Sequence, residues 1–417
     1  MTLMKTSDKA QRRARTLGGV FLVVALAILV LFVRGTEGSQ STTFVFNESK
    51  GEAYEIANLV FPTRVGLYLM AVLATFAGAY QLARGFRRAN TVLGIVAGFF
   101  VLAFLAWAAR DQSMNLTGLL KSSLLRSIPI ILAALSGVMC ERCGVVNIGI
   151  EGMMLSGAFM AALIGSVAQS VWVGMIGAML GGTLMAGLLA VLAIKYKVNQ
   201  VVAGTAINIL ATGLTSYFSS RYLQQNQALN NPPTFSPIPL PGLSRIPIIG
   251  PTLFDHTIPV YLTFVLVVVI QLMLFYTRWG LRTRAVGEHP RAADTLGVNV
   301  IMTRYVNVLL GGAVAGLGGA YLVLSSVARF DELMTAGKGY IGLAAMIFGK
   351  WTPVGALGSS LIFGFADSLQ TKLAILAVPI PSQFLLMAPY LVTMVVLAGV
   401  VGQSRAPAAD GEPYEKE

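Results

Sequence analysis

The chain has 417 residues, of which 55% are hydrophobic and only 12% charged, and its mean hydropathy is +0.73. A soluble globule of this length would need more polar residues to cover its surface, so the composition predicts an all-α, polytopic integral membrane protein surrounded by membrane lipid. The formal net charge of +12 would suit a nucleic-acid-binding protein. The basic residues are sorted between loops, however, so we expect no nucleic acid as a partner.

Apolar runs of the length that spans a bilayer, which takes about 20 residues in a helix, occur along most of the chain. A shorter apolar run at 340–348 indicates a half-helix. We therefore predict about ten to twelve transmembrane helices. The long runs are 17–33, 65–83, 91–109, 124–139, 148–167, 171–194, 201–218, 258–276, 305–324, 354–373 and 384–401.

The basic residues gather in alternate loops. They precede the first span and follow the second, sixth and eighth, whereas the loop at 35–62 has an excess of glutamate. Because cytoplasmic loops carry the excess of Lys and Arg, we place the N-terminus and these loops in the cytoplasm and the protein in the inner or plasma membrane of the cell, with a cytoplasmic C-terminus.

The chain divides into three parts by composition. Residues 1–115 are predicted to be an N-terminal extension with three spans, residues 116–402 the core, and residues 403–417 a polar, disordered cytoplasmic tail. The extracytoplasmic loop at 219–257 contains seven prolines, which exclude regular helix and favour extended structure. This loop suits a lid or docking surface for an extracytoplasmic partner, or equally an ordered connector.

A polar stretch at 140–156 lies between two membrane spans. It carries Asn147 and Glu151, which stand four residues apart and so are expected on one helical face. An acid costs about 2.5 to 3.5 kcal/mol at the centre of a membrane helix and usually faces a bundle interior or a water-filled path. We predict that this pair lines a substrate path, although Glu151 could instead be a structural acid paired with backbone or arginine.

The run at 201–218 also has a polar face. It carries Thr205 and Asn208, and Gln200 directly precedes it. We add these three residues to the predicted path, while a helix-to-helix hydrogen bond explains Asn208 equally well.

Small residues recur at every fourth position in three of the central spans, at 157–165, 174–190 and 311–319. This spacing lets membrane helices approach each other closely, so it predicts tight helix packing.

The basic loop at 278–300 contains a second informative pattern. Pro290 suits the first position of a short helix, and Gly297 suits the residue just past its end. Such a capped helix of about two turns is either plain loop structure or a means of passing force to a soluble partner.

The chain lacks the residues for chemistry of its own. It has only two cysteines, Cys140 and Cys143, and two histidines, from which we expect no closed four-ligand zinc site, and it contains no phosphate-binding P-loop motif. The two cysteines are interpreted as packing residues. We therefore predict no catalytic residue, no metal and no cofactor bound by this chain.

Several stretches of the sequence are similar to one family. The run at 141–159, with its Asn-Ile-Gly-Ile-Glu-Gly motif, closely resembles permease subunits of nucleoside and simple-sugar ABC importers. The stretches at 198–208, 246–250, 284–298 and 339–353 match the same family, and the resemblance covers roughly 119–401.

The resemblance implies a heteromeric importer with an ABC permease core. Its other members would be a second related permease, ABC ATPase subunits that use ATP, and an extracytoplasmic substrate-binding lipoprotein. The loop at 284–298 would hold the helix that couples to the ATPase, and the segment from Asn147 to Glu151 would line the path. The coupling residues are Gly287, Glu288, Pro290, Arg291, Ala292, Ala293, Asp294 and Gly297.

The motif forms look most like the nucleoside branch of that family. Sugars or branched-chain amino acids remain alternative substrates, and a secondary transporter driven by an ion gradient is the alternative mechanism.

Overall fold

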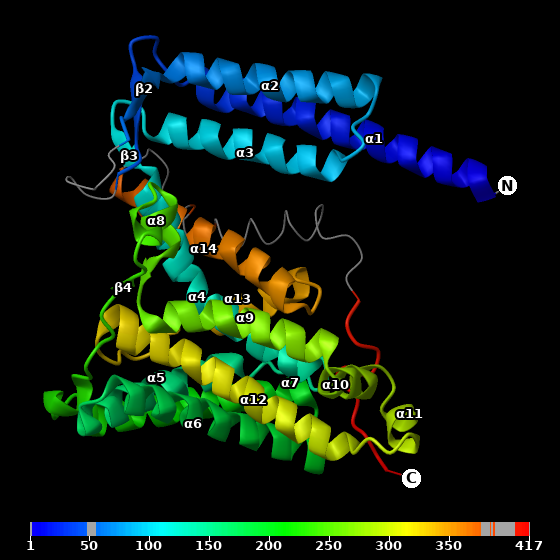
Figure 1. Cartoon of the computed structure of the whole chain (residues 1–417), viewed down its shortest axis with the longest axis vertical. Coiled ribbons are helices and arrows are strands. Elements are labelled where there is room, and N and C mark those ends of the chain that lie inside the picture. The colour runs from blue at the N-terminus through cyan, green and yellow to red at the C-terminus, as the bar shows by residue number, and fades with distance from the viewer. Residues whose placement is uncertain (1, 48–55, 377–383, 385–386, 388–404, 417) are drawn as a thin grey trace. The chain divides into compact units, whose positions relative to one another are not determined.

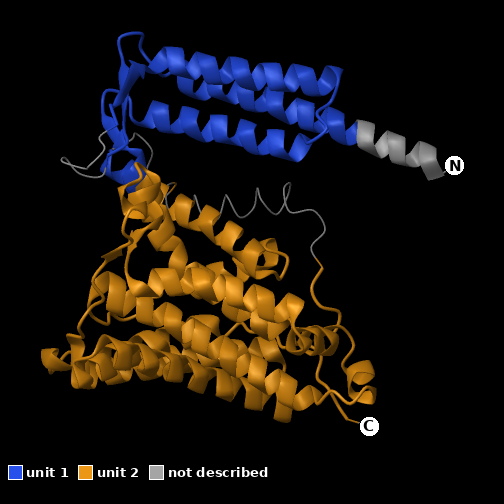
Figure 2. Ribbon diagram, in the orientation of Figure 1, with its two compact units in different colours: residues 1–118, 371–381 blue, residues 119–370, 382–417 orange. Residues whose placement is uncertain are grey.

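The computed structural model describes residues 2–47, 56–376, 384, 387 and 405–416, and it shows a helical protein with few strands (Figure 1). The chain divides into two compact units, one of residues 1–118 and 371–381 and one of residues 119–370 and 382–417 (Figure 2). Nine helices within the described residues are long and apolar enough to cross a membrane. The predicted all-α, polytopic membrane fold is confirmed.

The first unit is built from three apolar helices and a small sheet. Phe21, Ala25, Ala74 and Val96 are buried between the helices. Strand β1 pairs antiparallel with β2 and parallel with β3. The elements are α1 (Thr2–Ala27), extended by a π-helical turn (Ile28–Val33), β1 (Ser41–Val45), β2 (Leu59–Pro62), α2 (Thr63–Ala83), α3 (Ala89–Ala108) and β3 (Ser113–Asn115).

The second unit contains most of the predicted core. Its long helices are α4 (Leu116–Glu141), α5 (Ile150–Ala168), α6 (Val171–Ala190), α7 (Gln200–Phe218), α9 (Ile258–Tyr276), α12 (Val300–Tyr321) and α14 (Pro353–Ile375). Short helices α10 (Arg278–Glu288), α11 (Pro290–Thr295) and α13 (Lys338–Phe348) lie between them. Helix α13 is the half-helix predicted at 340–348. Helix α14 covers the span predicted at 354–373 but is not among the nine helices counted as long and apolar enough to cross a membrane. The span predicted at 384–401 falls almost wholly outside the described residues.

Glycines hold α5, α6 and α12 together at close range (Figure 1). A Cβ atom added to Gly182 of α6 would lie 2.3 Å from the carbonyl oxygen of Gly312 in α12, and one added to Gly316 would lie 2.2 Å from that of Ala178. Real Cβ atoms do not approach oxygen so closely, so only glycine fits. The tight packing predicted from the small-residue spacing is confirmed.

The proline-rich loop is more ordered than its composition predicts. It contains short helical turns, a two-residue strand pair between Ile238–Pro239 (β4) and Asp255–His256 (β5), and the helix α8 (Ile249–Leu253). The expectation that prolines exclude regular helix was wrong for α8. Pro251 occupies its first turn, where the backbone N–H needs no intrahelical partner.

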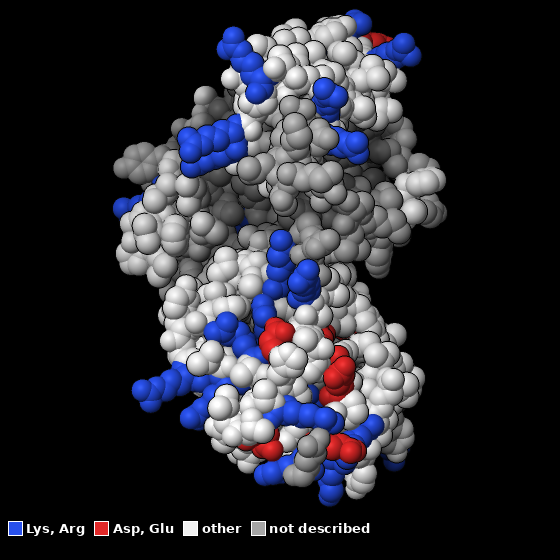
Figure 3. All heavy atoms as spheres, turned by 90° about the vertical axis from the view of Figure 1, so that its right-hand side faces the viewer, with Lys and Arg blue, Asp and Glu red and all other residues white. Residues whose placement is uncertain are grey.

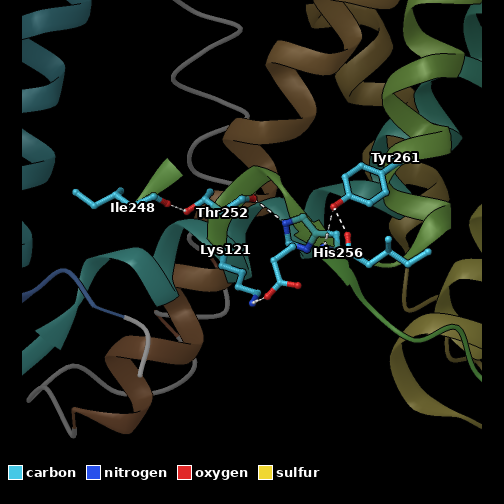
Figure 4. A network of polar contacts seen from close by, with 7 residues as sticks. Lys121, Ile248, Thr252, His256 and Tyr261 are labelled. Carbon is cyan, nitrogen blue, oxygen red and sulfur yellow. Dashed lines mark hydrogen bonds and ion pairs between the residues drawn. The ribbon is translucent and has the colours of Figure 1, made fainter. Parts of the chain in front are cut away.

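Polar contacts fix the end of this loop (Figure 4). The His256 ring nitrogen Nε2 lies 2.7 Å from the carbonyl oxygen of Thr252, and the His256 backbone N–H donates to the Tyr261 hydroxyl at 3.1 Å. That hydroxyl donates to the carbonyl of Ile238 at 2.9 Å, and Lys121 of α4 lies 3.8 Å from the Asp255 carboxylate. The loop is thus an ordered connector tied to α4 and α9.

Candidate functional site

The turn between α4 and α5 places the first predicted path residue. Helix α4 ends at Glu141, Gly144 has a φ of +83° that reverses the chain, and α5 begins only at Ile150. Asn147 therefore lies in the turn, and the prediction that it shares a helical face with Glu151 was wrong. The Asn147 amide is fully buried and donates to the sulfur atoms of Cys140 and Met153 at 3.3 and 3.5 Å.

Glu151 is held by backbone. Its carboxylate accepts the N–H of Gly337 at 2.8 Å and the N–H of Gly339 at 2.6 Å. These N–H groups belong to the start of α13, where the first turn of a helix has unsatisfied donors and a partial positive charge. The geometry therefore supports the structural alternative for Glu151, in which the acid pairs with backbone and joins α5 to α13.

Asn208 of α7 joins the same region from the other side. Its Oδ1 accepts the N–H of Gly152 at 2.8 Å, and its Nδ2 donates to the Ile148 carbonyl and the Tyr340 hydroxyl, both at 2.9 Å. One amide thus links α5, α7 and α13. We call Glu151, Asn208 and Tyr340, with the backbone groups they bind, the polar node.

The two remaining predicted residues differ in their contacts. Gln200, which is buried, accepts the Val146 N–H of the α4–α5 turn at 2.6 Å. Thr205 is exposed and donates only to the carbonyl of Val201, one turn earlier in its own helix. Four of the five predicted path residues therefore meet around the α4–α5 turn, and Thr205 lies on the exposed face of α7.

Sequence reasoning missed Tyr340 and the two glycines that Glu151 binds. Tyr340 is 48% exposed, so its ring reaches the surface while its hydroxyl touches Asn208. The available signal was the Gly337-Lys338-Gly339 run before an apolar half-helix, which marks a helix start with free N–H groups.

The segment α10–α11 has the local structure that its sequence predicts. Pro290 is the first residue of α11, and Gly297 follows its end with a φ of +81°. The N–H groups of Gly297 and Val298 close the helix on the carbonyls of Asp294 and Ala293. The predicted short helix is confirmed.

A small apolar cluster orients α11. Ala293 is buried against Val286 and Val300, whereas Leu296 is 85% exposed at the end of the helix. Glu288 and Arg291 are also exposed. The helix therefore turns a charged surface with one large apolar side chain away from the unit.

This segment touches the α4–α5 turn directly. A Cβ atom added to Gly287 would lie 2.3 Å from the carbonyl oxygen of Arg142, so the two backbones are in contact. The α4–α5 turn is thus bound by α10 at one side and by Gln200 and Asn208 of α7 at the other.

The C-terminal residues are packed on the same surface. The Ala409 N–H donates to the Gly287 carbonyl at 2.9 Å, and Arg304 donates to the Glu412 carbonyl at 2.9 Å. The predicted disorder of the tail was therefore wrong for residues 405–416, because backbone and buried charge supply specific partners that a polar composition does not reveal.

The site is built from hydrogen bonds of buried side chains with backbone groups and from one close backbone contact. Within the described ranges no cluster of three or more His, Cys, Asp or Glu could hold a metal ion. Cys140 and Cys143 are free and buried.

Residues 119–401 match the family described as branched-chain amino acid transport system / permease component. The chain belongs to this family. The matched range includes the polar node and the α10–α11 segment, whereas residues 1–118 and the C-terminal residues after 401 lie outside it.

Individual relatives agree with this assignment. The permease is 40% identical to the guanosine ABC transporter permease protein NupQ of Bacillus subtilis over 318 residues, which cover 73% of this chain and 99% of the relative. It is 41% identical to the nucleoside ABC transporter permease protein NupC of Lactococcus lactis over 70% of this chain and 95% of the relative. A putative glucose ABC transporter permease protein of Haloferax volcanii, TsgC13, is 35% identical over 61% of this chain and 77% of the relative. No solved structure matches the permease.

Proposed function

We propose that the permease is the membrane-spanning subunit of an ATP-driven importer for nucleosides. The observation that carries the proposal is the contact between Gly287 of α10 and the Arg142 carbonyl of the α4–α5 turn. Through this contact, the charged surface of α11 is connected directly to the buried polar residues around the α4–α5 turn. The names of NupQ and NupC favour nucleosides over the glucose named for TsgC13, which is the less similar relative.

The proposed orientation follows the basic residues. The face with α10 and α11 lies in the cytoplasm of the cell, together with both termini, and the proline-rich loop lies outside. Figure 3 shows basic side chains on the face of the second unit that carries these helices, with acidic side chains among them. A mixed-charge surface of this kind suits a soluble protein partner more than a nucleic acid.

In the proposed mechanism, an ABC ATPase subunit binds α11, with Leu296 as an apolar contact and Glu288, Arg291 and Asp294 as polar ones. ATP is bound and hydrolysed by that partner, and this chain contributes no catalytic group, metal or cofactor. Movement of α11 passes through Gly287 to the α4–α5 turn. The polar node then carries it to α7 and α13, because these helices are bonded to the turn and to the start of α5.

The remaining partners are proposed from the exposed surfaces. A second related permease covers the face of α7 and α13 on which Thr205 and Tyr340 are exposed, so that the path lies between two subunits. A substrate-binding lipoprotein docks on the outer face. The path residues that we propose in this chain are Asn147, Gln200, Thr205 and Asn208, while Glu151 takes the structural role that its backbone contacts support.

A pull-down tests the proposal. The tagged permease is isolated from its own cells in mild detergent beside a variant carrying Glu288→Ala, Arg291→Ala and Asp294→Ala. We expect an ATPase and a second permease with the native chain, and loss of the ATPase alone from the variant. A permease that purifies alone in both samples and transports by itself after reconstitution would overturn the proposal in favour of an ion-driven transporter.

A sugar is the second candidate substrate, because the glucose permease TsgC13 is 35% identical. Uptake of labelled guanosine by the reconstituted complex, with glucose or a branched-chain amino acid as competitor, separates the candidates. If unlabelled nucleosides inhibit guanosine uptake and the other competitors do not, our proposal is supported. Uptake of labelled glucose without uptake of guanosine would favour the sugar.

A further inference from the structure

We infer that residues 407–416, which we call the strap, are a positioning element that holds the α10–α11 segment against the α4–α5 turn, so that movement of α11 reaches the path. The inference rests on the proposed function. The strap lies beyond residue 401, where the family match ends.

Main-chain bonds of the strap reach both sides of the contact. The Ala409 N–H donates to the Gly287 carbonyl at 2.9 Å, and the Ala408 N–H donates to the Glu288 carboxylate at 3.2 Å. The Gly411 N–H donates to the Gly144 carbonyl at 3.4 Å. Three backbone N–H groups within residues 408–411 thus bind α10 and the α4–α5 turn to one segment.

Buried side chains anchor the strap at its centre. Asp410 interacts electrostatically with Glu141, Cys143 and Arg304, which lie around it at the end of α4 and on α12.

Arg304 of α12 is 1% exposed, and the carbonyl oxygen of Glu412 accepts from its Nη1 at 2.9 Å. A buried arginine needs such partners, because an unpaired buried charge is strongly unfavourable. The strap therefore supplies polar groups that α12 alone does not.

The far end of the strap rests on the apolar cluster that orients α11. Tyr414 packs against Val286, Ala293 and Val300, and the exposed Glu415 pairs with Lys197 before α7. A groove of about 520 Å³ runs between the strap and α11, lined by Glu288, His289, Pro290 and Arg291 on one side and by Ala408, Ala409, Glu412, Pro413, Tyr414 and Glu415 on the other. A protein that docks on α11 therefore meets the strap as well.

The strap leaves Leu296 of α11 open. That side chain is 85% exposed although Ala293, three residues before it, is buried in the cluster beneath Tyr414. The strap thus fixes the inner side of α11 without covering its outer side. This arrangement fits a positioning role and does not fit a cap that blocks the partner.

The test compares the native complex with three variants: a chain ending after residue 406, Ala409→Pro and Asp410→Ala. Proline removes the N–H that binds Gly287. Arg405→Ala, at an exposed position just before the strap, is the matched control. The readouts are guanosine imported per ATP hydrolysed in proteoliposomes, the amount of ATPase that co-purifies, and amide exchange over residues 287–298.

We expect each strap variant to keep its ATPase but to import less guanosine per ATP. Amide exchange at 287–298 should rise about tenfold, since a lost bond of ordinary strength changes a local opening equilibrium by roughly that factor. Exchange in α5 should be unchanged. The inference would be overturned if Ala409→Pro and Asp410→Ala changed neither the guanosine imported per ATP nor the amide exchange at 287–298. This holds even if the shortened chain failed to fold.

The exchange measurement also separates this inference from the proposed function. It can be made on the permease without partners. Faster amide exchange at 287–298 in strap variants of a permease that binds no ATPase would support the strap as a positioning element and overturn the proposed function. Normal ATP-driven import by the strap variants, with unaltered amide exchange at 287–298, would overturn the inference about the strap alone.

Discussion

Glu151 and Gly339 join the first turns of two helices: the carboxylate of Glu151, at the start of α5, accepts the Gly339 N–H at the start of α13 at 2.6 Å, and its other oxygen accepts the Gly337 N–H. An acid at this place neutralises the positive end of α13 and satisfies two of its free donors. The node therefore depends on a carboxylate that accepts its two hydrogen bonds from backbone N–H groups.

Glu151→Gln should destabilise the permease. The amide retains one accepting oxygen and presents an NH₂ group to the second N–H, so a buried donor is left unpaired at a cost of about 1–3 kcal/mol. Thermal unfolding in detergent measures the loss, with Glu37→Gln, an exposed acid of the first unit, as the control. An unchanged unfolding temperature together with lost import would instead assign Glu151 to the substrate.

Asn208→Ala should cost more than Tyr340→Phe. The alanine removes three hydrogen bonds and leaves the Gly152 N–H and the Ile148 carbonyl unpaired, which we estimate at about 3 kcal/mol. Phenylalanine removes only the hydroxyl that Asn208 contacts, at about 1 kcal/mol. The two unfolding midpoints can be compared in one detergent, and equal shifts would show that the node is not centred on Asn208.

Much of the permease could be predicted from its sequence because membrane helices have a strong local signal. The length of the apolar runs predicted most of the spans. Small residues at every fourth position indicated the packing of α5, α6 and α12, and Pro290 with Gly297 indicated α11. Each of these features depends on neighbours within a few residues.

The predictions that failed depended on the ends of helices and on distant partners. Asn147 was expected on a helix, but the positive φ of Gly144 keeps the chain in a turn until Ile150. The groups that interact with Glu151 and Asp410 lie far away in sequence. Neither the contact of Glu151 with α13 nor the packing of the tail could therefore be predicted from composition.

Gly182→Ala should destabilise the packing of α6 on α12, because the new methyl group would lie 2.3 Å from the Gly312 carbonyl oxygen and backbone would have to move. Overpacking of this kind costs about 1–3 kcal/mol. Gly187→Ala in the same helix is the matched control, since its nearest neighbour, Leu309, is 3.5 Å away. Alanine there should be neutral or stabilise by up to about 1 kcal/mol through helix propensity. Similar unfolding temperatures for the two variants would contradict the proposed close contact.

Leu296→Ala should weaken ATPase binding without lowering the stability of the permease, because the residue is 85% exposed. A buried leucine at an interface contributes roughly 1.5–3 kcal/mol, so the dissociation constant should rise about tenfold or more. Leu281→Ala, on α10 and 61% exposed, controls for general loss of apolar surface. Binding can be measured by titrating labelled ATPase onto the permease in nanodiscs, and equal effects of both variants would remove α11 from the centre of the interface.

Docking of the strap should strengthen as the pH falls. Burial raises the pKa of the Asp410 carboxyl from 3.8 to about 6, although its interaction with Glu141 and the charge of Arg304 lower it in part. The docked strap then holds a proton on Asp410 that the free strap releases. The stabilisation of docking by this proton is complete below the pKa of Asp410 in the free strap, and it is lost as the pH rises through the pKa of Asp410 in the docked strap. Amide exchange of residues 287–298, corrected for intrinsic exchange, should show greater protection at about pH 5 than at about pH 7.5. Asp410→Asn, which cannot titrate, should remove the difference that Asp410 contributes, while Glu141, Cys143 and Arg304 remain in place around it. Protection that rises with pH in the native chain, or an equal pH dependence in Asp410→Asn, would show that this carboxyl does not control the strap.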